Sequence, residues 1–456
     1  MKEIRILSPQ GMLGYGYPIE SLEYGLAQHP HAISVDAGST DGGPHRLGMG
    51  VGGVSRYATK KDLKPLVIAA KKHNIPLLIG SAGGSGANLR VQWTVDILKE
   101  IAEEENIELT IAAIYADVSK EWLMTKWEQG KVTSVGSAPL LTEQAIQDTT
   151  ALVGQMGVEP YLEALKEGVD IIVGGRTYDP VMTAALPLFY RMDPGLSWHM
   201  GKILECGAIA ATPGTAKDGM IGMIRDDHFL VRPLHPSRKC TIQSVAAHTL
   251  YEKSHPYLLP GPGGILDLSQ CKFSQEDERT VRVTGSQFIP SSQYEIKLEG
   301  VRPSGYRTVL VAGVRDPFFI HQLETIIEKV KMDVADYFPE IESSEAKLYF
   351  KYYGLNGVMG PWEKTSSEPL EVGIVIEVVA PTQELADSIC AYARSVLMHI
   401  DYEGRVSTAG NLALPFAPPE FSAGQVFEFS IYHTVAVDDP LELFTIKRIT
   451  LGRRKS

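Results

Sequence analysis

The chain has 456 residues and a formal net charge of −12, with 44% hydrophobic and 21% charged residues. This is the composition of a globular protein long enough for two or three domains, and it lacks the clustered basic residues of a nucleic-acid-binding surface. No apolar run approaches the roughly 20 residues of a membrane span, and the start MKEIRILSPQG has no signal-peptide pattern. We therefore expect no nucleic-acid or membrane partner.

The cysteines lie far apart in the sequence. Cys206, Cys240, Cys271 and Cys390 form no CxxC pair, so the sequence indicates neither a redox pair nor a local zinc site. Scattered single cysteines are typical of reduced thiols, and we expect a cytoplasmic protein.

Strand and helix patterns alternate through the first part of the chain. Short apolar runs predict strands, and apolar residues three or four positions apart predict helices. The predicted elements are a strand at Ile4–Leu7, a helix at Pro18–Ala27, a strand at Ala32–Val35, a helix at Thr59–His73, a strand at Ile75–Ile79, a helix carrying Val91, Val95, Leu98 and Ala102, and strands at Leu109–Tyr115 and Val169–Val173. This order predicts a parallel sheet covered by helices, with the loops after the strands at one edge. Ligands of open α/β sheets bind at that edge.

The pattern of apolar residues changes from about Asp218. Short runs such as HFLVRPLHP and TVRVTGSQFI predict a β-rich, antiparallel extension over about 218–300. The last third of the chain follows the strand and helix order of a ferredoxin-like fold. Its predicted elements are a strand at RTVLVAGV, a helix at Pro317–Tyr337, strands at AKLYFKYYG and VGIVIEVVA, a helix at Gln383–Ile400 and a strand at VFEFSIYHTVAV. We predict an α/β protein with a parallel-sheet domain over 1–300, including the extension, and a ferredoxin-like α+β domain over 301–456. The first of these two helices should bury Phe319, Leu323, Ile326, Ile327 and Val330 against its sheet.

A glycine-rich loop, GSAGGSGAN at 80–88, follows one predicted strand and precedes a helix. Asn88 is predicted as the helix N-cap, and the helix would present free N–H groups and its positive dipole end to an anion. Ser81, Gly83, Gly84, Gly86 and Asn88 are therefore predicted to bind substrate. The alternative is a tight turn in which the glycines allow close packing.

A second loop, DAGSTDGGPH at 36–45, also follows a strand. Asp36, Asp41 and His45 could divide the roles of general acid and base, and we predict them as catalytic. The same donors leave a divalent cation open as an alternative. A second alternative is an Asx-turn loop in which the aspartates bond their own backbone.

A third loop, GGRTYDP at 174–180, places Arg176 and Asp179 at a strand end, and Asp117 ends a further strand. The planar guanidinium of Arg176 suits a carboxylate or phosphate. We predict these three residues as substrate-binding, with an internal Arg176–Asp179 ion pair as the alternative. All three loops should line one crevice.

Five segments in order along the chain resemble the AtuA family, named for acyclic terpene utilisation. They are DAGSTDGGPH at 36–45, GSAGGSGAN at 80–88, VGGRTYDP at 173–180, ILECGAIAATPG at 203–214 and YGLNGVMG at 353–360. The resemblance implies an AtuA domain followed by a smaller ferredoxin-like domain, and a link to degradation of acyclic terpenes or related small carboxylic acids. It implies no agreed reaction and no agreed catalytic residues.

These observations together lead us to expect an enzyme acting on a small anionic metabolite, a carboxylate or an acyl-CoA thioester. A hydro-lyase is the preferred class, because it needs one group to take a proton α to a carbonyl and another to assist the leaving group. The alternatives are a hydrolase or transferase that uses the same pocket, and a non-catalytic subunit or metabolite-binding protein. We predict no cofactor, and either a homo-oligomer or a small partner subunit.

Overall fold

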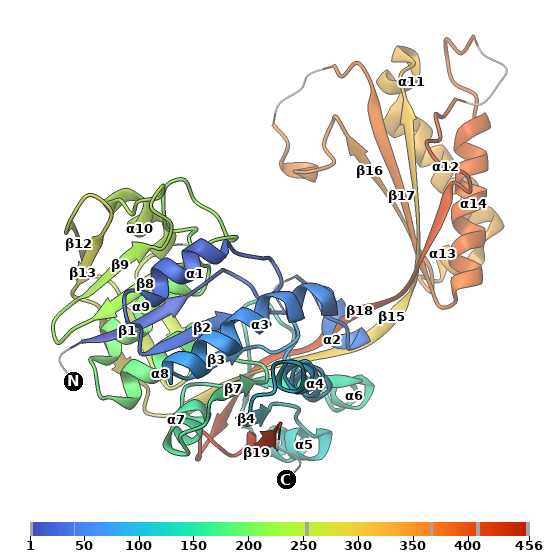
Figure 1. Ribbon diagram of the computed structural model, residues 1–456. Coiled ribbons are helices and arrows are strands. Elements are labelled where there is room, and N and C mark those ends of the chain that lie inside the picture. Colours follow the sequence, from blue (N-terminus) through green and yellow to red (C-terminus); the bar gives the residue numbers. More distant parts are fainter. Residues whose placement is uncertain (1–2, 41, 251–254, 365–367, 407–410, 453–456) are drawn as a thin grey trace. The chain divides into compact units, whose positions relative to one another are not determined.

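The computed structural model describes residues 3–40, 42–250, 255–364, 368–406 and 411–452. The chain divides into two compact units, one formed by Met1–Arg302 with Phe429–Ser456 and the other by Pro303–Glu428 (Figure 1). The first division lies next to the predicted boundary at 300/301, but the prediction also assigned 429–456 to the second domain. The structure differs because strand β19 (Thr445–Leu451) pairs antiparallel with β4 (Leu109–Tyr115) over its full length and so belongs to the first unit.

The first unit begins with alternating strands and helices, as predicted. In chain order its elements up to the extension are β1 (Ile4–Ser8), α1 (Ile19–Leu26), β2 (Ala32–Asp36), α2 (His45–Met49), α3 (Arg56–His73), β3 (Leu77–Gly80), α4 (Asn88–Glu105), β4, α5 (Lys120–Glu128), β5 (Val132–Ser134), α6 (Glu143–Asp148), β6 (Ala151–Gln155), α7 (Glu159–Lys166), β7 (Ile171–Gly174), α8 (Val181–Phe189) and α9 (Pro194–Leu204).

The main sheet of this unit contains ten strands within the described residues, in the order β12-β13-β9-β8-β1-β2-β3-β7-β4-β19. Its centre, β1-β2-β3-β7-β4, is parallel throughout. Parallel strands need crossovers, and the intervening helices supply them. The loops after β2, β3 and β7 therefore lie at the same edge of the sheet, which is the arrangement predicted from the sequence.

Helices cover both faces of this parallel centre (Figure 1). Alternate residues of each strand face opposite sides: Ile4 and Ile6 pack in the core formed with α7, α8 and α9, whereas Leu7 and Ile33 pack in the core formed with α1, α3 and α4. Strands buried on both faces are expected to read as continuous apolar runs, and β3 (LLIG) and β7 (IIVG) do so.

The antiparallel extension predicted from Asp218 forms two structures. Its elements are β8 (Met220–Ile224), β9 (Phe229–Pro233), α10 (Ile242–Thr249), β10 (Leu258–Gly261), β11 (Gly264–Asp267), β12 (Lys272–Gln275), β13 (Val281–Thr284) and β14 (Gln287–Pro290). Strands β8, β9, β13 and β12 extend the main sheet in antiparallel fashion. Strands β10, β11 and β14 form a separate small sheet.

The second unit contains its own sheet and helices. Its elements, together with the two long strands that continue past its limits, are β15 (Tyr294–Val314), α11 (Pro317–His321), α12 (Leu323–Tyr337), α13 (Pro339–Glu342), β16 (Lys347–Tyr353), the 3₁₀ turn η1 (Gly360–Trp362), β17 (Val372–Ala380), α14 (Gln383–His399) and β18 (Glu420–Val437). The strands follow the order β16-β17-β15-β18 in the sheet, which continues to β5. The five apolar residues predicted to be buried on the first helix are at most 2% exposed, so that prediction is confirmed.

The helix predicted at Pro317–Tyr337 is two helices. Gln322, at φ −101° and ψ 9°, leaves helical geometry between α11 and α12. Its side-chain amide donates to the carbonyl of Phe318 at 3.0 Å and so satisfies the exposed end of α11. No helix within the described residues is long and apolar enough to cross a membrane.

Candidate functional site

The three loops singled out in the sequence meet at the edge of the parallel sheet. Asp36 is the register partner of Gly80, and the backbone N–H of Ala82 donates to the carbonyl of Gly174 at 2.9 Å. The three loops therefore lie next to one another at this edge. The two cavities there are lined by residues of the 36–45 and 174–180 loops and by none of 80–88, so a single crevice lined by all three loops stays a prediction.

The glycine-rich loop packs against the protein's own backbone. A Cβ on Gly38 would lie 2.4 Å from Gly84 Cα, and a Cβ on Gly86 would lie 2.3 Å from the backbone nitrogen of Arg176. Gly83, Gly84 and Gly86 also have positive φ, at 65°, 108° and 67°, which L side chains disfavour. In the structure these glycines therefore allow a tight turn with close backbone packing, which was the alternative interpretation. Their contact with substrate stays a prediction.

The N-terminus of α4, predicted as a seat for a substrate anion, is occupied by the chain itself. Ala87, not Asn88, is the N-cap residue. The backbone N–H of Asn88 donates to Asp117 Oδ1 at 2.8 Å, and Asn88 Oδ1 accepts from the backbone N–H groups of Ala116 and Asp117. A helix N-terminus favours a carboxylate, and Asp117 is the carboxylate that satisfies it.

Arg176 is buried and paired with a residue far away in the sequence. Its side chain is 1% exposed, and it forms a bidentate ion pair with the fully buried Glu299 of β15, with Nε–Oε2 at 2.8 Å and Nη2–Oε1 at 3.3 Å. Lys297 Nζ lies 2.9 Å from Glu299 Oε1. Burial by itself raises the pKa of Glu299, but the charges and hydrogen bonds of Arg176 and Lys297 outweigh it and lower this pKa to about 2.

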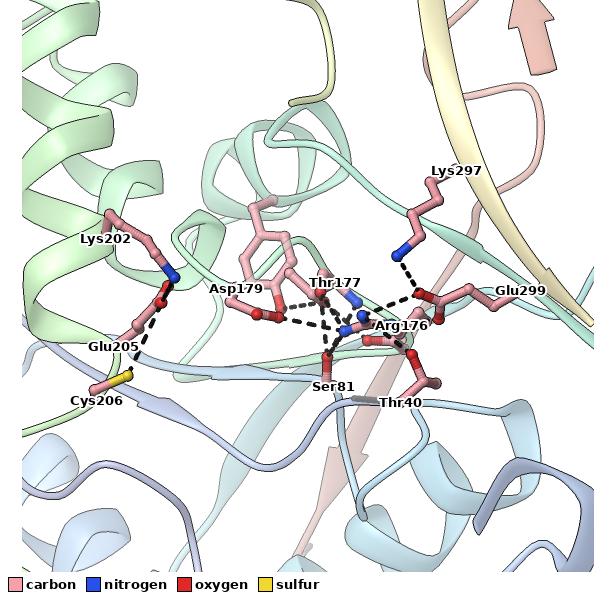
Figure 2. Close-up of polar contacts among 12 residues, drawn as sticks. Thr40, Ser81, Arg176, Thr177, Asp179, Lys202, Glu205, Cys206, Lys297 and Glu299 are labelled. Atoms are coloured by element: carbon pink, nitrogen blue, oxygen red, sulfur yellow. Dashed lines mark hydrogen bonds and ion pairs between the residues drawn. The ribbon is translucent and has the colours of Figure 1, made fainter. Parts of the chain in front are cut away.

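The same guanidinium joins the three loops (Figure 2). Nη1 of Arg176 lies 3.3 Å from Asp179 Oδ1 and donates to Ser81 Oγ at 3.2 Å, and Nη2 approaches Thr40 Oγ1 at 3.5 Å. The internal ion pair given as an alternative is therefore present. Ser81, which is fully buried and has φ 45°, is held by Arg176 and by the backbone of Thr177.

A cavity of about 170 Å³ lies at this edge, and we call it the Asp36 cavity. Its lining residues are Gly11, Met12, Tyr15, Asp36, Ser39, Asp179, Glu205, Cys206, Ile209 and Ala216. Asp36 Oδ1 is buried without a hydrogen-bond partner among the described residues, while the backbone N–H of Gly38 donates to the same carboxyl group. A buried carboxyl oxygen without a partner is costly, and a ligand in this cavity could satisfy it.

The surroundings of Asp36 favour its protonated form. Burial raises the pKa of Asp36 well above its usual range, and the negative charges of Asp179 and Glu205 raise it further. The Gly38 hydrogen bond and the charge of Arg176 act in the opposite direction but are weaker. A carboxyl group kept neutral in this way can donate a proton at neutral pH.

Lys202 and Glu205 form an ion pair at the C-terminal end of α9 (Figure 2). Both side chains are less than 10% exposed. Burial alone would lower the pKa of Lys202, but the charge of Glu205 and its hydrogen bond raise it, so Lys202 keeps its proton. Cys206 Sγ lies 4.0 Å from Glu205 Oε1.

A second and larger cavity of about 500 Å³, which we call the Lys202 cavity, adjoins the first. Its lining residues are Val135, Gln155, Arg176, Tyr178, Asp179, Lys202, Leu258, Leu259, Pro260, Gly261, Pro262, Glu295, Lys297, Tyr432 and Thr434. Asp179 lines both cavities. The Lys202–Glu205 pair also connects them, because Lys202 lines one and Glu205 the other.

The remaining predicted catalytic residues are placed differently. Asp41 lies outside the described residues. His45 is the exposed first residue of α2 and lines neither of the two cavities. Of the predicted catalytic residues that the structure describes, Asp36 is therefore the one at the cavity, and the roles of all three stay predictions.

Sequence reasoning missed Lys202, Glu205, Lys297 and Glu299. Lys297 and Glu299 are two residues apart on β15, so they share one face of the strand. That spacing in YEIKLEGV was the available signal, since a charged pair facing a core demands partners. Lys202 and Glu205 stand three apart on a helix, the spacing of an ordinary ion pair.

Fold and site together define an α/β protein with a cavity lined by acidic residues at the carboxyl edge of its parallel sheet. The chain belongs to the family described as acyclic terpene utilisation family protein AtuA, whose family model matches residues 56–411. This confirms the resemblance seen in the sequence, and the family name points to a role in acyclic terpene utilisation. No curated protein and no solved structure matched the chain.

Gly86→Ala should destabilise the protein much more than Gly136→Ala. Both glycines have positive φ, but a Cβ at Gly86 meets the backbone of Arg176, whereas a Cβ at Gly136 meets nothing within 4 Å. Overpacking typically costs about 1–3 kcal/mol beyond the dihedral strain that both variants share. Urea unfolding of the two variants measures the difference, and equal losses would contradict this packing role.

Glu299→Gln should lower the free energy of unfolding by roughly 3–5 kcal/mol, because it leaves Arg176 buried without its full counter-charge. Glu295→Gln, four residues earlier on β15 and exposed, is the matched control and should change stability by less than about 0.5 kcal/mol. The stabilisation by Glu299 is present above its unfolded pKa and is lost as the pH falls toward about 2. A variant that retains wild-type stability at pH 7 would refute the central role of this pair.

Asp36→Asn should stabilise the protein at neutral pH. The pKa of Asp36 is raised in the folded state, so the wild type loses stability as the pH rises above the range in which an unfolded aspartate ionises, about 4. The amide cannot ionise, and we expect a gain in stability at pH 7 that vanishes near pH 4. Chemical unfolding across this pH range, with the exposed Asp226→Asn as control, would contradict the assignment if Asp36→Asn lost stability at pH 7.

Proposed function

We propose that this protein is an enzyme of small-molecule catabolism, and that it is a hydro-lyase acting on a small carboxylic acid or its thioester. The observation that carries the proposal is the buried Asp36, whose Oδ1 has no hydrogen-bond partner among the described residues and whose pKa is raised, in a cavity shared with Asp179. Two carboxyl groups whose surroundings favour opposite protonation states are the usual arrangement for paired acid and base catalysis.

Each of the two groups has a role that its surroundings favour. The Arg176 guanidinium 3.3 Å from Asp179 favours the carboxylate ion, which suits Asp179 as the base that removes the proton α to the substrate carbonyl. The electron pair of that C–H bond forms the double bond as the C–O bond at the β carbon breaks. The leaving hydroxyl departs as water with the proton of Asp36, and hydration runs through the same steps in reverse.

The cations of the Lys202 cavity support an anionic substrate. Lys202 and Lys297 both line this cavity, and each is already paired with a carboxylate. A substrate carboxylate placed beside them would join an existing ion-pair network, in which charge-assisted hydrogen bonds are stronger than neutral ones. Asp179, at the junction of the two cavities, then lies between the bound acid group and Asp36.

A hydrolase or transferase is the second candidate, and Cys206 is the observation that favours it. Its thiol lines the Asp36 cavity and could accept an acyl group from a thioester. The neighbouring carboxylates of Glu205 and Asp179 oppose formation of a thiolate, however, and the thiolate is the nucleophile. The hydro-lyase is therefore preferred.

Two wider parts of the proposal have their own support. The strand order of the second unit, with its strand-helix-strand-strand-helix-strand sequence, supports a ferredoxin-like class for residues 303–428. All four cysteines are free, which supports a reducing, cytoplasmic location.

The test is isotope exchange and dehydration in D₂O, followed by proton NMR, on a panel of short 3-hydroxycarboxylic acids and their α,β-unsaturated counterparts. We expect deuterium at the α carbon and interconversion of hydroxy and unsaturated acids for at least one member of the panel. Asp36→Asn should lower turnover by about a hundredfold or more, while Asp226→Asn should leave it unchanged.

Three outcomes would count against the proposal. Acids that raise the thermal unfolding temperature but never exchange or dehydrate would indicate a metabolite-binding protein. Near-normal turnover in Asp36→Asn would remove Asp36 from the chemistry. Release of free thiol from a thioester, abolished by Cys206→Ser, would instead favour the acyl-transfer candidate.

A further inference from the structure

The small sheet β10-β11-β14 presents one apolar row to the interior of the first unit. Leu259 is the register partner of Leu266, and Leu266 is the register partner of Phe288, so the three side chains lie on the same face of three adjacent strands. Leu259 and Leu266 are 8% and 5% exposed. The next residue along β14, Ile289, is on the opposite face and is 48% exposed.

This row forms one wall of a narrow slot. Trp198 of α9 forms the facing wall, with its ring centroid 6.1 Å from that of Phe288 and 5.9 Å from that of Tyr178. The free volume of the slot is about 10 Å³. One water-sized group needs about 10–15 Å³, so any group that enters the slot must be very small.

Close approach of the walls depends on glycine at two positions. A Cβ on Gly261 would lie 2.8 Å from the Tyr178 ring, and a Cβ on Gly264 would lie 2.6 Å from the Phe288 ring. Both glycines lie on the same face of the small sheet as Leu266, because each is two residues along its strand from a member of the row. The sheet therefore holds the aromatic rings close to its own backbone.

The slot is continuous with the Lys202 cavity. Tyr178, Lys202 and Leu259 line both spaces. The larger space contains several charged side chains, whereas the slot is lined mainly by aromatic and aliphatic ones, with Lys202 as its one charged residue. A ligand that spans both must carry a polar group and a compact apolar group a few atoms apart.

We propose that this slot is the apolar subsite of the Lys202 cavity, and that Leu266 limits the size of the apolar group that a ligand can place there. The ligand class is a short carboxylic acid, or a derivative of one, that bears a compact apolar branch. This inference rests on the proposed function for the carboxylate end of the ligand, but the slot itself does not depend on it. One methylene too many in an apolar pocket typically changes binding by about 10- to 200-fold.

Two variants at Leu266 test the proposal in opposite directions. Leu266→Ala widens the slot and Leu266→Phe fills it, while Ile289→Ala, on the exposed face of the adjacent strand, is the matched control. The probes are butanoate, 3-methylbutanoate and 3-methylpentanoate, with the three corresponding primary amides as a second series. Binding is measured by calorimetry, and saturation-transfer NMR reports whether the branch methyl contacts the protein.

We expect the wild type and Ile289→Ala to bind the 3-methylbutanoyl probe at least tenfold more tightly than the larger one. Leu266→Ala should shift the preference to 3-methylpentanoyl, and Leu266→Phe should abolish the preference for a branch. If Leu266→Phe fails to fold, as judged by circular dichroism, the change in ligand-size preference of Leu266→Ala still tests the proposal.

The two probe series separate failure of the slot from failure of the proposed function. If the amides show the size preference and the acids do not bind, the slot stands and the carboxylate site is wrong. If both series bind without a size preference, or Leu266→Ala leaves the preference unchanged, the slot proposal is overturned. Absence of binding in both series overturns it as well.

Discussion

The buried ion pair between Arg176 and Glu299 is the interaction on which the site depends. It joins the loop after β7 to strand β15, 123 residues later in the chain, and the remaining donors of the guanidinium hold the loops after β2 and β3. Two charges removed from water must be closely paired and fully hydrogen-bonded, or the cost of desolvation exceeds the attraction. The Arg176 side chain therefore connects the three loops to one another and to β15.

Charge balance around this pair explains the state of Asp36. Arg176 and Lys297 are balanced by Glu299 and Asp179, and Lys202 is balanced by Glu205. Within this group of residues, a further negative charge on Asp36 would have no cation of its own. The surroundings therefore favour the protonated form of Asp36, whereas an aspartate in water is ionised at neutral pH. Burial of the Asp36 carboxyl group lowers the free energy of unfolding, and such a local loss of stability is typical of functional sites.

The glycines of this edge illustrate how a pattern can be read in two ways. A glycine-rich loop before a helix is typical of anion binding, and also of a turn in which two segments of backbone touch. The structure shows the second arrangement at Gly86 and Gly38, and it places the carboxylate of Asp117 at the helix N-terminus. The sequence shows both patterns equally, because the identity of the group that approaches a glycine is not encoded in the loop itself.

The sequence by itself determined the features that depend on short-range order. Apolar periodicity located β4 to the residue, the other central strands to within a residue or two, and the order of strands and helices placed the three loops at one edge. Alternation after Asp218 indicated the antiparallel extension, and helical spacing identified the buried face of α12. Only the tertiary structure decided the partner of Arg176, the return of residues 429–456 to the first unit and the orphaned oxygen of Asp36. Each of these features depends on contacts between residues more than a hundred positions apart in the chain. Burial controls both ion pairing and protonation, and it results from these long-range contacts rather than from any local pattern.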